Sequence, residues 1–329
     1  MAISIKDVAK MAEVSVATVS RVLNKNTNVK EETEKRVLDA IEKTGYKPNA
    51  IARSLKVKNT RTIGIMIPDI SSNFFPEVVR GIEDVANEFN YNIILCNTDL
   101  DREKESKYLD ILVEKQVDGI IYMSNTFTDQ LAEKVKKMGI EIVLISTDYK
   151  DLPSITIDNV KASKDAVDYL IEKGYENIAL IGGQMTDPNA GLPRYNGYIN
   201  AMSHAGKTIN KDFIVEGNYK FESGYTGMKK LLELEKKPDA VFTVSDEMAV
   251  GIIRAVLESG YKVPKDMAVI GFDNTNMAKM TYPSLTTLSQ PLYEMGAVGM
   301  RLLTKLLNKE EVENHKIVLE HELIKRESA

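Results

Sequence analysis

The first 24 residues place apolar and polar side chains at helical spacing, which predicts two short helices joined by a tight turn. Ser4 and Asp7 stand at the spacing of a capping box, so they are expected to start the first helix. Residues 13–15 interrupt the pattern, and Ser15 can cap the second helix. The apolar positions expected to face inward are Ile5, Val8, Ala9, Ala12, Val19 and Val22.

A third helix is expected next, because the glutamates at 31–32 favour a helix N-terminus through the helix dipole. Val37, Leu38 and Ile41 are expected to form its apolar stripe, and Gly45 suits a left-handed C-terminal stop. Three short helices make a domain of about 45 residues, close to the lower limit for independent folding.

From residue 62 the pattern changes, and short apolar runs alternate with amphipathic segments. This alternation predicts strands followed by helices, and hence parallel sheets covered by helices on both faces. About 268 residues is long for one such sheet, so two subdomains are expected. The expected strands are 63–67, 92–95, 119–122, 141–145, 178–181, 240–244 and 268–271. The expected helices are 75–89, 103–115, 128–138, 160–173, 191–206, 222–235, 246–260 and 292–308.

The predicted fold is therefore an α/β core preceded by an all-α head. We expect a head over 1–47, a hinge and linker over 48–60, and a core over 61–329. The first crossing between the two lobes of the core is placed near Asp158 and the return near Gln290. The lobes then comprise about 61–158 with 291–320, and about 159–290 with 321–329.

The head has the pattern of a helix-turn-helix, whose second helix enters the major groove of DNA. Arg21 could grip guanine with two hydrogen bonds, and Val16 and Ala17 could touch thymine methyl groups. Ser15 and Thr18 could contact phosphates or base edges. The alternative is an ordinary helical hairpin with an exposed polar face. The DNA contacts expected from this helix are Ser15, Val16, Ala17, Thr18, Ser20 and Arg21.

The charge distribution supports DNA binding by the head. Residues 1–60 hold 12 Lys and Arg against 7 Asp and Glu, whereas the whole chain has a net charge of −5. The remaining residues are therefore acidic. A basic head on an acidic body is typical of a DNA reader whose core does not touch the duplex.

These features resemble the lactose-repressor/galactose-repressor family of bacterial transcription regulators, over essentially the whole chain. The resemblance implies a two-lobed, periplasmic-binding-protein-like core, and a homodimer that binds pseudo-palindromic operator DNA. One departure is Glu13, which stands where many helix-turn-helix proteins place Gly or Asn. The motifs beyond the head are 45–49, 52–55, 62–69, 117–120, 194–198, 245–249, 271–274 and 283–287.

The resemblance also implies that residues 48–60 contain a hinge that folds on DNA and inserts Leu55 into the minor groove. An apolar wedge of this kind kinks the duplex and admits more contact. Without the resemblance, Leu55 would more simply be a linker residue that covers the core. The remaining DNA contacts carried over from the family are Asn28, Asn49, Ala52, Arg53 and Leu55.

Polar side chains follow several predicted strands, where ligands of parallel α/β sheets bind. Hydroxyls, carboxylates and the adjacent Phe74 and Phe75 suit a polyol, although each aspartate alone could equally cap a helix. The resemblance implies a sugar or sugar-phosphate effector held by Phe74, Phe75, Ser146, Arg194, Ser245, Asp273 and Gln290. Other strand-end residues expected to face this cleft include Asp69, Thr98, Ser124, Thr147 and Asp246.

The segment 293–305 resembles one subgroup of the family, the catabolite control repressors. In that subgroup a helix face binds the serine-phosphorylated phosphocarrier protein HPr. Arg301 and Lys305 would suit a phosphoserine, while Glu294 replaces the usual Asp. The alternative is a plain surface helix of a sugar-responsive repressor that does not depend on HPr. The matching positions are Tyr293, Glu294, Ala297, Val298, Arg301 and Lys305.

Several classes of protein find no support in the sequence. No apolar run reaches 18 residues and no apolar signal opens the chain, so a cytoplasmic location without membrane insertion is expected. One cysteine and three scattered histidines give no disulfide and no metal-ligand spacing. No nucleotide-binding or nucleophile motif is present, so neither an enzyme nor a cofactor is expected. A sugar receptor that does not bind DNA would lack the basic head.

Overall fold

The computed structural model describes residues 3–23, 29–46, 60–125 and 127–329. The chain divides into two compact units, Met1–Thr60 and Arg61–Ala329, which we describe separately. We call the first unit the head and the second unit the core.

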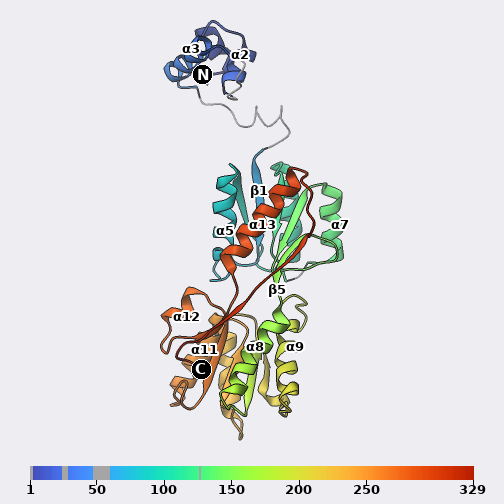
Figure 1. Cartoon of the computed structure of the whole chain (residues 1–329), viewed down its shortest axis with the longest axis vertical. Coiled ribbons are helices and arrows are strands. Elements are labelled where there is room, and N and C mark those ends of the chain that lie inside the picture. The colour runs from blue at the N-terminus through green and yellow to red at the C-terminus, as the bar shows by residue number, and fades with distance from the viewer. Residues whose placement is uncertain (1–2, 24–28, 47–59, 126) are drawn as a thin grey trace. The chain divides into compact units, whose positions relative to one another are not determined.

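The described residues of the head form three helices, α1 (Ile5–Met11), α2 (Val16–Leu23) and α3 (Glu31–Thr44) (Figure 1). Their packing confirms the predicted inward face of the first two helices. The prediction for α3 was wrong at Leu38, which is 51% exposed, whereas Ala40 is buried. Val37 and Ala40 are three residues apart and so share one face of the helix, while Leu38 points elsewhere. The buried residues of the head are Val8, Ala9, Ala12, Val19, Val22, Val37 and Ala40.

The local signals that start and stop these helices act as the sequence predicts. The backbone N–H and the hydroxyl of Ser4 donate to the Asp7 carboxylate at 2.8 and 2.7 Å, which lowers the pKa of Asp7. Glu13 adopts a left-handed φ of 52° in the turn, a conformation that costs a non-glycine residue about 1–2 kcal/mol. Gly45, with a φ of 66°, ends α3.

The first lobe of the core, here called the N lobe, holds a six-stranded parallel sheet in the order β11-β5-β4-β3-β1-β2. One face packs on α5 and α13 and the other on α6 and α7, because successive side chains along each strand point to opposite faces. The strands are β1 (Thr62–Ile67), β2 (Asn92–Asn97), β3 (Gly119–Tyr122), β4 (Glu141–Ile145), β5 (Ser154–Ile157) and β11 (Lys316–Leu319). The helices are α5 (Phe75–Glu88), α6 (Arg102–Glu114), α7 (Asp129–Met138) and α13 (Leu292–Leu307).

The second lobe, the C lobe, holds another six-stranded sheet in the order β12-β10-β9-β8-β6-β7. Its pairs are parallel except β10 with β12, a departure from the fully parallel sheet that the sequence predicts. The strands are β6 (Ile178–Gly182), β7 (Ile214–Glu216), β8 (Ala240–Thr243), β9 (Ala268–Asp273), β10 (Thr286–Ser289) and β12 (Glu322–Ile324). The helices are α8 (Asn159–Glu172), α9 (Gly191–His204), α10 (Phe221–Glu233), α11 (Asp246–Glu258), α12 (Asn276–Met280) and the 3-10 turn η1 (Lys211–Phe213).

Three chain segments join the lobes (Figure 1). The chain leaves the N lobe between β5 and α8, returns between β10 and α13, and crosses again between β11 and β12. Asp158 lies at the first crossing, where its carboxylate accepts a hydrogen bond from the backbone N–H of Lys161 and caps α8. The two sheets are therefore joined by three separate stretches of chain. In the described part of the chain, each helix is too short or too polar to span a lipid bilayer.

Candidate DNA-binding helix and effector cleft

Helix α2 presents a surface of small and polar side chains. Val16 is 40% exposed, and Ala17 and Arg21 are also exposed, while Thr18 and Ser20 are half-buried. Val19 and Val22 anchor the opposite side of the helix in the core of the head. The exposed side is therefore free to meet the edges of bases. The predicted DNA contacts Asn28, Asn49, Ala52, Arg53 and Leu55 lie outside the described residues.

Ser15 and Thr18 are engaged with each other at the start of α2. The backbone N–H of Thr18 donates to the Ser15 hydroxyl at 3.1 Å, and the two side-chain oxygens lie 2.9 Å apart. Ser15 thus caps the helix as predicted. Among the predicted contacts of α2, Arg21 is the charged side chain, and it alone can form a two-pronged hydrogen bond with guanine.

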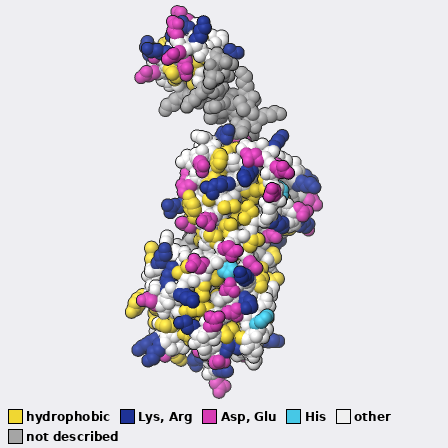
Figure 2. All heavy atoms as spheres, viewed as in Figure 1, with side chains coloured by type: hydrophobic (Ala, Val, Ile, Leu, Met, Phe, Trp, Pro, Cys, Tyr) yellow, Lys and Arg dark blue, Asp and Glu magenta, His cyan; other side chains and the backbone are white. Residues whose placement is uncertain are grey.

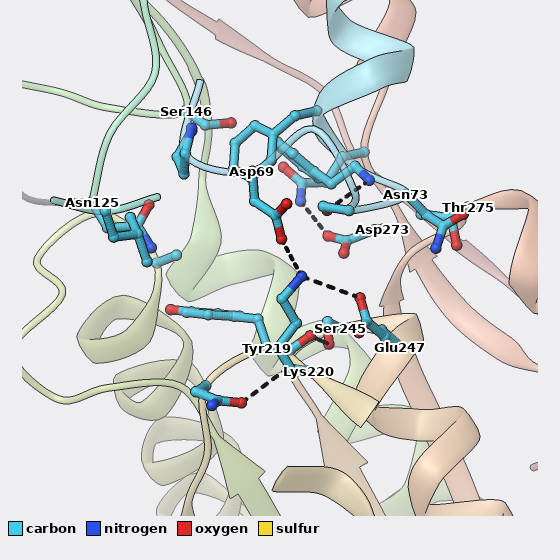
Figure 3. Close-up of a pocket in the computed structure, with 18 of the residues that line it drawn as sticks. Asp69, Asn73, Asn125, Ser146, Tyr219, Lys220, Ser245, Glu247, Asp273 and Thr275 are labelled. Carbon is cyan, nitrogen blue, oxygen red and sulfur yellow. Dashed lines mark hydrogen bonds and ion pairs between the residues drawn. The ribbon is translucent and has the colours of Figure 1, made fainter. Parts of the chain in front are cut away.

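A cavity of about 470 Å³ opens between the two lobes of the core (Figure 3). Residues of both lobes line it, at the ends of strands and at the starts of helices. The structure brings together all the residues predicted for an effector site, which are Phe74, Phe75, Ser146, Arg194, Ser245, Asp273 and Gln290.

Arg194 and Asp273 form the buried polar centre of the cleft. Arg194 donates from Nε to Asn159 Oδ1 at 2.9 Å and from Nη1 to the carbonyl of Val244 at 2.7 Å. Its Nη1 lies 4.0 Å from Asp273 Oδ1, and Gln290 donates to the same oxygen at 2.8 Å. These groups offer a hydroxyl-bearing ligand both donors and acceptors at fixed positions.

Burial decides the protonation of Asp273. It raises the pKa of this carboxyl well above its usual range, and the nearby Arg194 opposes that rise. Asp273 also has a φ of 108°, a strained conformation for a residue other than glycine. The guanidinium of Arg194 stacks over the Phe272 ring at 3.7 Å, which helps to hold the arginine in place.

Aromatic side chains supply the apolar surface of the cleft. Phe74 and Phe75 meet edge to face with ring centroids 5.0 Å apart, at the start of α5. Tyr219 lines the opposite lobe, and its hydroxyl donates to Asp187 at 2.7 Å. Carbohydrate rings stack readily on such apolar faces, while their hydroxyls need polar partners at the edges.

The exposed face of α13 carries most of the residues predicted to bind a protein partner. Glu294, Arg301 and Lys305 are exposed and Val298 is half-buried. Tyr293 is 39% exposed, and its hydroxyl donates to Asp84 of α5 at 2.9 Å, which raises the tyrosine pKa. Figure 2 shows basic side chains on one face of the upper part of the core.

The prediction that Ala297 belongs to this exposed face was wrong. Ala297 is only 3% exposed and packs between α13 and α5. The two helices approach closely because Gly81 of α5 packs against the backbone of α13 and Gly296 of α13 packs against the backbone of α5. Ala297, next to Gly296, is therefore covered by α5 and does not reach solvent.

Comparisons with known proteins decide the family. Residues 4–49 match the family described as bacterial regulatory proteins, lacI family, and residues 167–329 match a periplasmic binding protein-like domain. The chain is 52% identical to the HTH-type transcriptional regulator RegA of Clostridium saccharobutylicum, covering 100% of this chain and 99% of RegA. It is 46% identical to catabolite control protein A of Priestia megaterium, with the same coverage. This chain belongs to the LacI family of bacterial transcription regulators.

A solved structure extends the likeness to the whole fold of this LacI-family regulator. The lac repressor dimer bound to operator and the anti-inducer ONPF superposes with a TM-score of 0.90 at 25% identity, covering 100% of this chain and 99% of that chain. The likeness confirms the predicted α/β fold with its helical head. This protein is therefore a DNA-binding transcription regulator, as its relatives named above are.

Some residues predicted for the cleft of this regulator point into a lobe instead. Thr98 donates to the carbonyl of Ile67, Ser124 donates to Glu105, and Thr147 donates to the carbonyl of Ser124. The buried Asp246 accepts hydrogen bonds from Thr275 and Thr287. Successive side chains at the end of a strand point in opposite directions, so only some of the polar residues at each strand end face the cleft. The others tie neighbouring strand ends together.

The cleft also contains residues that the sequence did not predict. Tyr219 and Lys220 follow β7, a strand of three residues that is too short to carry a pattern. Glu247 lies in the first turn of α11, one residue after a buried aspartate. No motif marks Asn125 or Thr275, although both line the cavity.

Proposed function

We propose that this regulator is a homodimeric repressor that binds a pseudo-palindromic operator through α2 of each head. The single observation that carries the proposal is the exposed position of Arg21 among small side chains on α2, in a basic head. The operator-bound lac repressor dimer supports a dimer, because two-fold symmetry of the protein matches two-fold symmetry of the site. The hinge prediction, including insertion of Leu55, belongs to the same proposal.

We further propose that serine-phosphorylated HPr is a corepressor and binds the exposed face of α13. The relative in Priestia megaterium is called catabolite control protein A, and this chain covers it almost entirely. Arg301 and Lys305 are exposed four residues apart on one face, where their charges would meet a phosphoserine. Tyr293 adds an aromatic contact at the edge of that face.

The cleft between the lobes is proposed to bind a sugar or sugar-phosphate effector. The buried Arg194, Asp273 and Gln290 supply fixed hydrogen-bonding groups, and Phe74 and Phe75 supply stacking surfaces. An effector changes DNA affinity only as far as it binds the two arrangements of the lobes unequally.

Replacing Arg21 with alanine tests the proposal that α2 reads bases. Arg21→Ala should reduce the free energy of operator binding by roughly 1–3 kcal/mol for the base pair that Arg21 contacts in each half-site. The variant should also lose its preference for guanine at that base pair. Fluorescence anisotropy on an operator and on its single-base variants, at fixed salt, measures both effects. The matched control is Lys10→Ala, which removes an exposed cation of α1 and should weaken all sequences about equally. An equal loss on every sequence for Arg21→Ala would show that Arg21 contacts phosphate only.

Replacing Arg301 with alanine tests the proposed corepressor site. Arg301→Ala should weaken binding of serine-phosphorylated HPr about 10- to 100-fold, since a hydrogen bond to a charged group contributes about 1.5–3 kcal/mol. Isothermal titration calorimetry measures the affinity, with Lys309→Ala as a control for a nearby exposed cation beyond α13. Equal affinities for phosphorylated and unphosphorylated HPr would contradict the proposal.

A further inference from the structure

A chain of three charged side chains crosses the effector cleft (Figure 3). Lys220 Nζ donates to Asp69 Oδ2 and lies 3.9 Å from Glu247 Oε2. Asp69 follows β1 in the N lobe, whereas Lys220 precedes α10 and Glu247 lies in α11 of the C lobe. The ammonium group of Lys220 therefore ties a carboxylate of one lobe to a carboxylate of the other.

Both ends of the inter-lobe contact are held in place by their own lobes. Asp69 Oδ1 accepts from the backbone N–H and the hydroxyl of Ser71 at 2.8 and 2.7 Å. The backbone N–H of Lys220 donates to Asn218 Oδ1 at 3.2 Å. These bonds fix the Asp69 carboxylate and the backbone of Lys220, so the ion pair joins a defined point of one lobe to a defined point of the other.

The carboxyl of Asp69 is charged in this arrangement. Burial raises its pKa, but the hydrogen bonds from Lys220 and Ser71 outweigh burial and lower the pKa below the usual range. Its side chain is 26% exposed and that of Lys220 is 40% exposed, so solvent screens the pair only in part.

Among the described residues, the other hydrogen bonds between the lobes at this cleft join uncharged groups. Asn73 Nδ2 donates to the sulfur of Met277 at 3.0 Å, and the backbone N–H of Asp148 donates to Asn189 Oδ1 at 2.8 Å. Ion pairs such as Lys207 with Glu176 stay within one lobe. A hydrogen bond between two charged groups is about twice as strong as one between neutral groups, so the Lys220–Asp69 bond should be stronger than the two neutral bonds named above.

We propose that Lys220 is a latch: a positioning residue that holds the lobes closed through Asp69. A ligand that enters the cleft meets this ion pair, and it changes the lobe arrangement if it breaks the pair. The inference rests on the proposed function, because it treats the lobe arrangement as the quantity that sets operator affinity. It adds the residue that controls that arrangement.

The latch is tested by the distance between the lobes in the full-length chain without ligand. Cysteines placed at the exposed Lys137 of α7 and Lys230 of α10 carry a donor and an acceptor fluorophore. The native Cys96 is buried and burial raises its thiol pKa, so it reacts slowly with the labels. Labelled chains are mixed with an excess of unlabelled chains, so that a dimer rarely holds two labelled chains. The energy transfer measured then occurs between the two lobes of one chain.

Lys220→Met should change the energy-transfer distribution, with at least a twofold rise in the population of a second lobe arrangement. Asp69→Asn should have the same effect, because the amide keeps the acceptor for Ser71 and loses the charge that attracts Lys220. The double variant should differ little from either single variant, since both remove the same interaction. Lys207→Met, which removes an ion pair inside the C lobe, should leave the distribution unchanged.

Two results overturn the latch. One is a Lys220→Met variant with the wild-type transfer distribution. The other is an equal change in Glu247→Gln, which removes a charge of the C lobe alone and should keep the lobes closed. The operator affinity of the same variants then distinguishes the latch itself from the proposed coupling between the lobes and DNA binding. If Lys220→Met opens the lobes but leaves operator affinity and its response to HPr within twofold of wild type, the latch stands and the proposed coupling of lobes to DNA fails.

Discussion

Val37→Ser should weaken operator binding strongly while leaving the core folded. Val37 is fully buried in the head, where the described residues supply a core of seven buried side chains. Removing its methyl groups and burying a hydroxyl costs roughly 3 kcal/mol, by comparison with other truncations in protein cores. A domain of about 45 residues has only a few kcal/mol of stability, so most heads would be unfolded. Refolding each head on the DNA would then cost about 1 kcal/mol, so the operator affinity of a dimer with two heads should fall about 10- to 100-fold.

The neighbouring Leu38 provides the matched control for this prediction. Leu38 is 51% exposed on the same helix, so Leu38→Ser should leave the head folded. Amide hydrogen exchange reports the folding of head and core separately, and anisotropy reports operator affinity. If the head amides of the Val37→Ser variant stay protected from hydrogen exchange, the packing around α3 contributes less to the stability of the head than the structure indicates.

Gly296→Ala should destabilise the N lobe by about 3 kcal/mol, at the upper end of the range for overpacked cores. A Cβ at this position would lie 2.0 Å from the carbonyl oxygen of Val78, and a Cβ at Gly81 would lie 2.0 Å from that of Tyr293. The obstacle in both cases is the backbone of the facing helix, which cannot turn aside as a side chain can. Helices α5 and α13 must therefore move apart, which would also disturb the proposed partner face.

Gly299 on the same helix gives the control for Gly296→Ala. There a Cβ would meet the end of the Ile145 side chain at 2.6 Å, a group that can change rotamer. Gly299→Ala should therefore lose clearly less stability than Gly296→Ala in thermal unfolding. Equal losses from both substitutions would contradict the close helix crossing.

The larger elements of the fold could be predicted from the sequence because their patterns are long. The helices from α5 to α11, apart from short turns, begin and end within about two residues of the predicted positions, as the usual uncertainty of helix ends allows. Strands β5, β7, β10, β11 and β12 were missed, because polar residues interrupt or flank their apolar runs of three residues or fewer. Strands β3 and β8 are also short, but their nearly continuous apolar runs were recognised. Leu38 was misplaced because an apolar residue beside a buried one looks like part of the stripe.

The cleft was predicted through strand ends and through the family resemblance, and each source had its limit. Residues such as Arg194, Asp273 and Gln290 do meet in one cavity. Thr98, Ser124 and Asp246 stand at similar strand ends but bond inside a lobe, because direction depends on register rather than on residue type. Lys220 could not be foreseen, since its role depends on Asp69, 151 residues away in the chain.

The measurement that tests the account most directly is the affinity of the full-length regulator for a pseudo-palindromic operator, with and without serine-phosphorylated HPr. Fluorescence anisotropy at fixed salt gives both affinities on one labelled duplex, and a scrambled duplex gives the non-specific level. The account predicts sequence-specific binding that tightens when phosphorylated HPr is added and does not tighten with the unphosphorylated protein. Operator binding that is indifferent to phosphorylated HPr would contradict it.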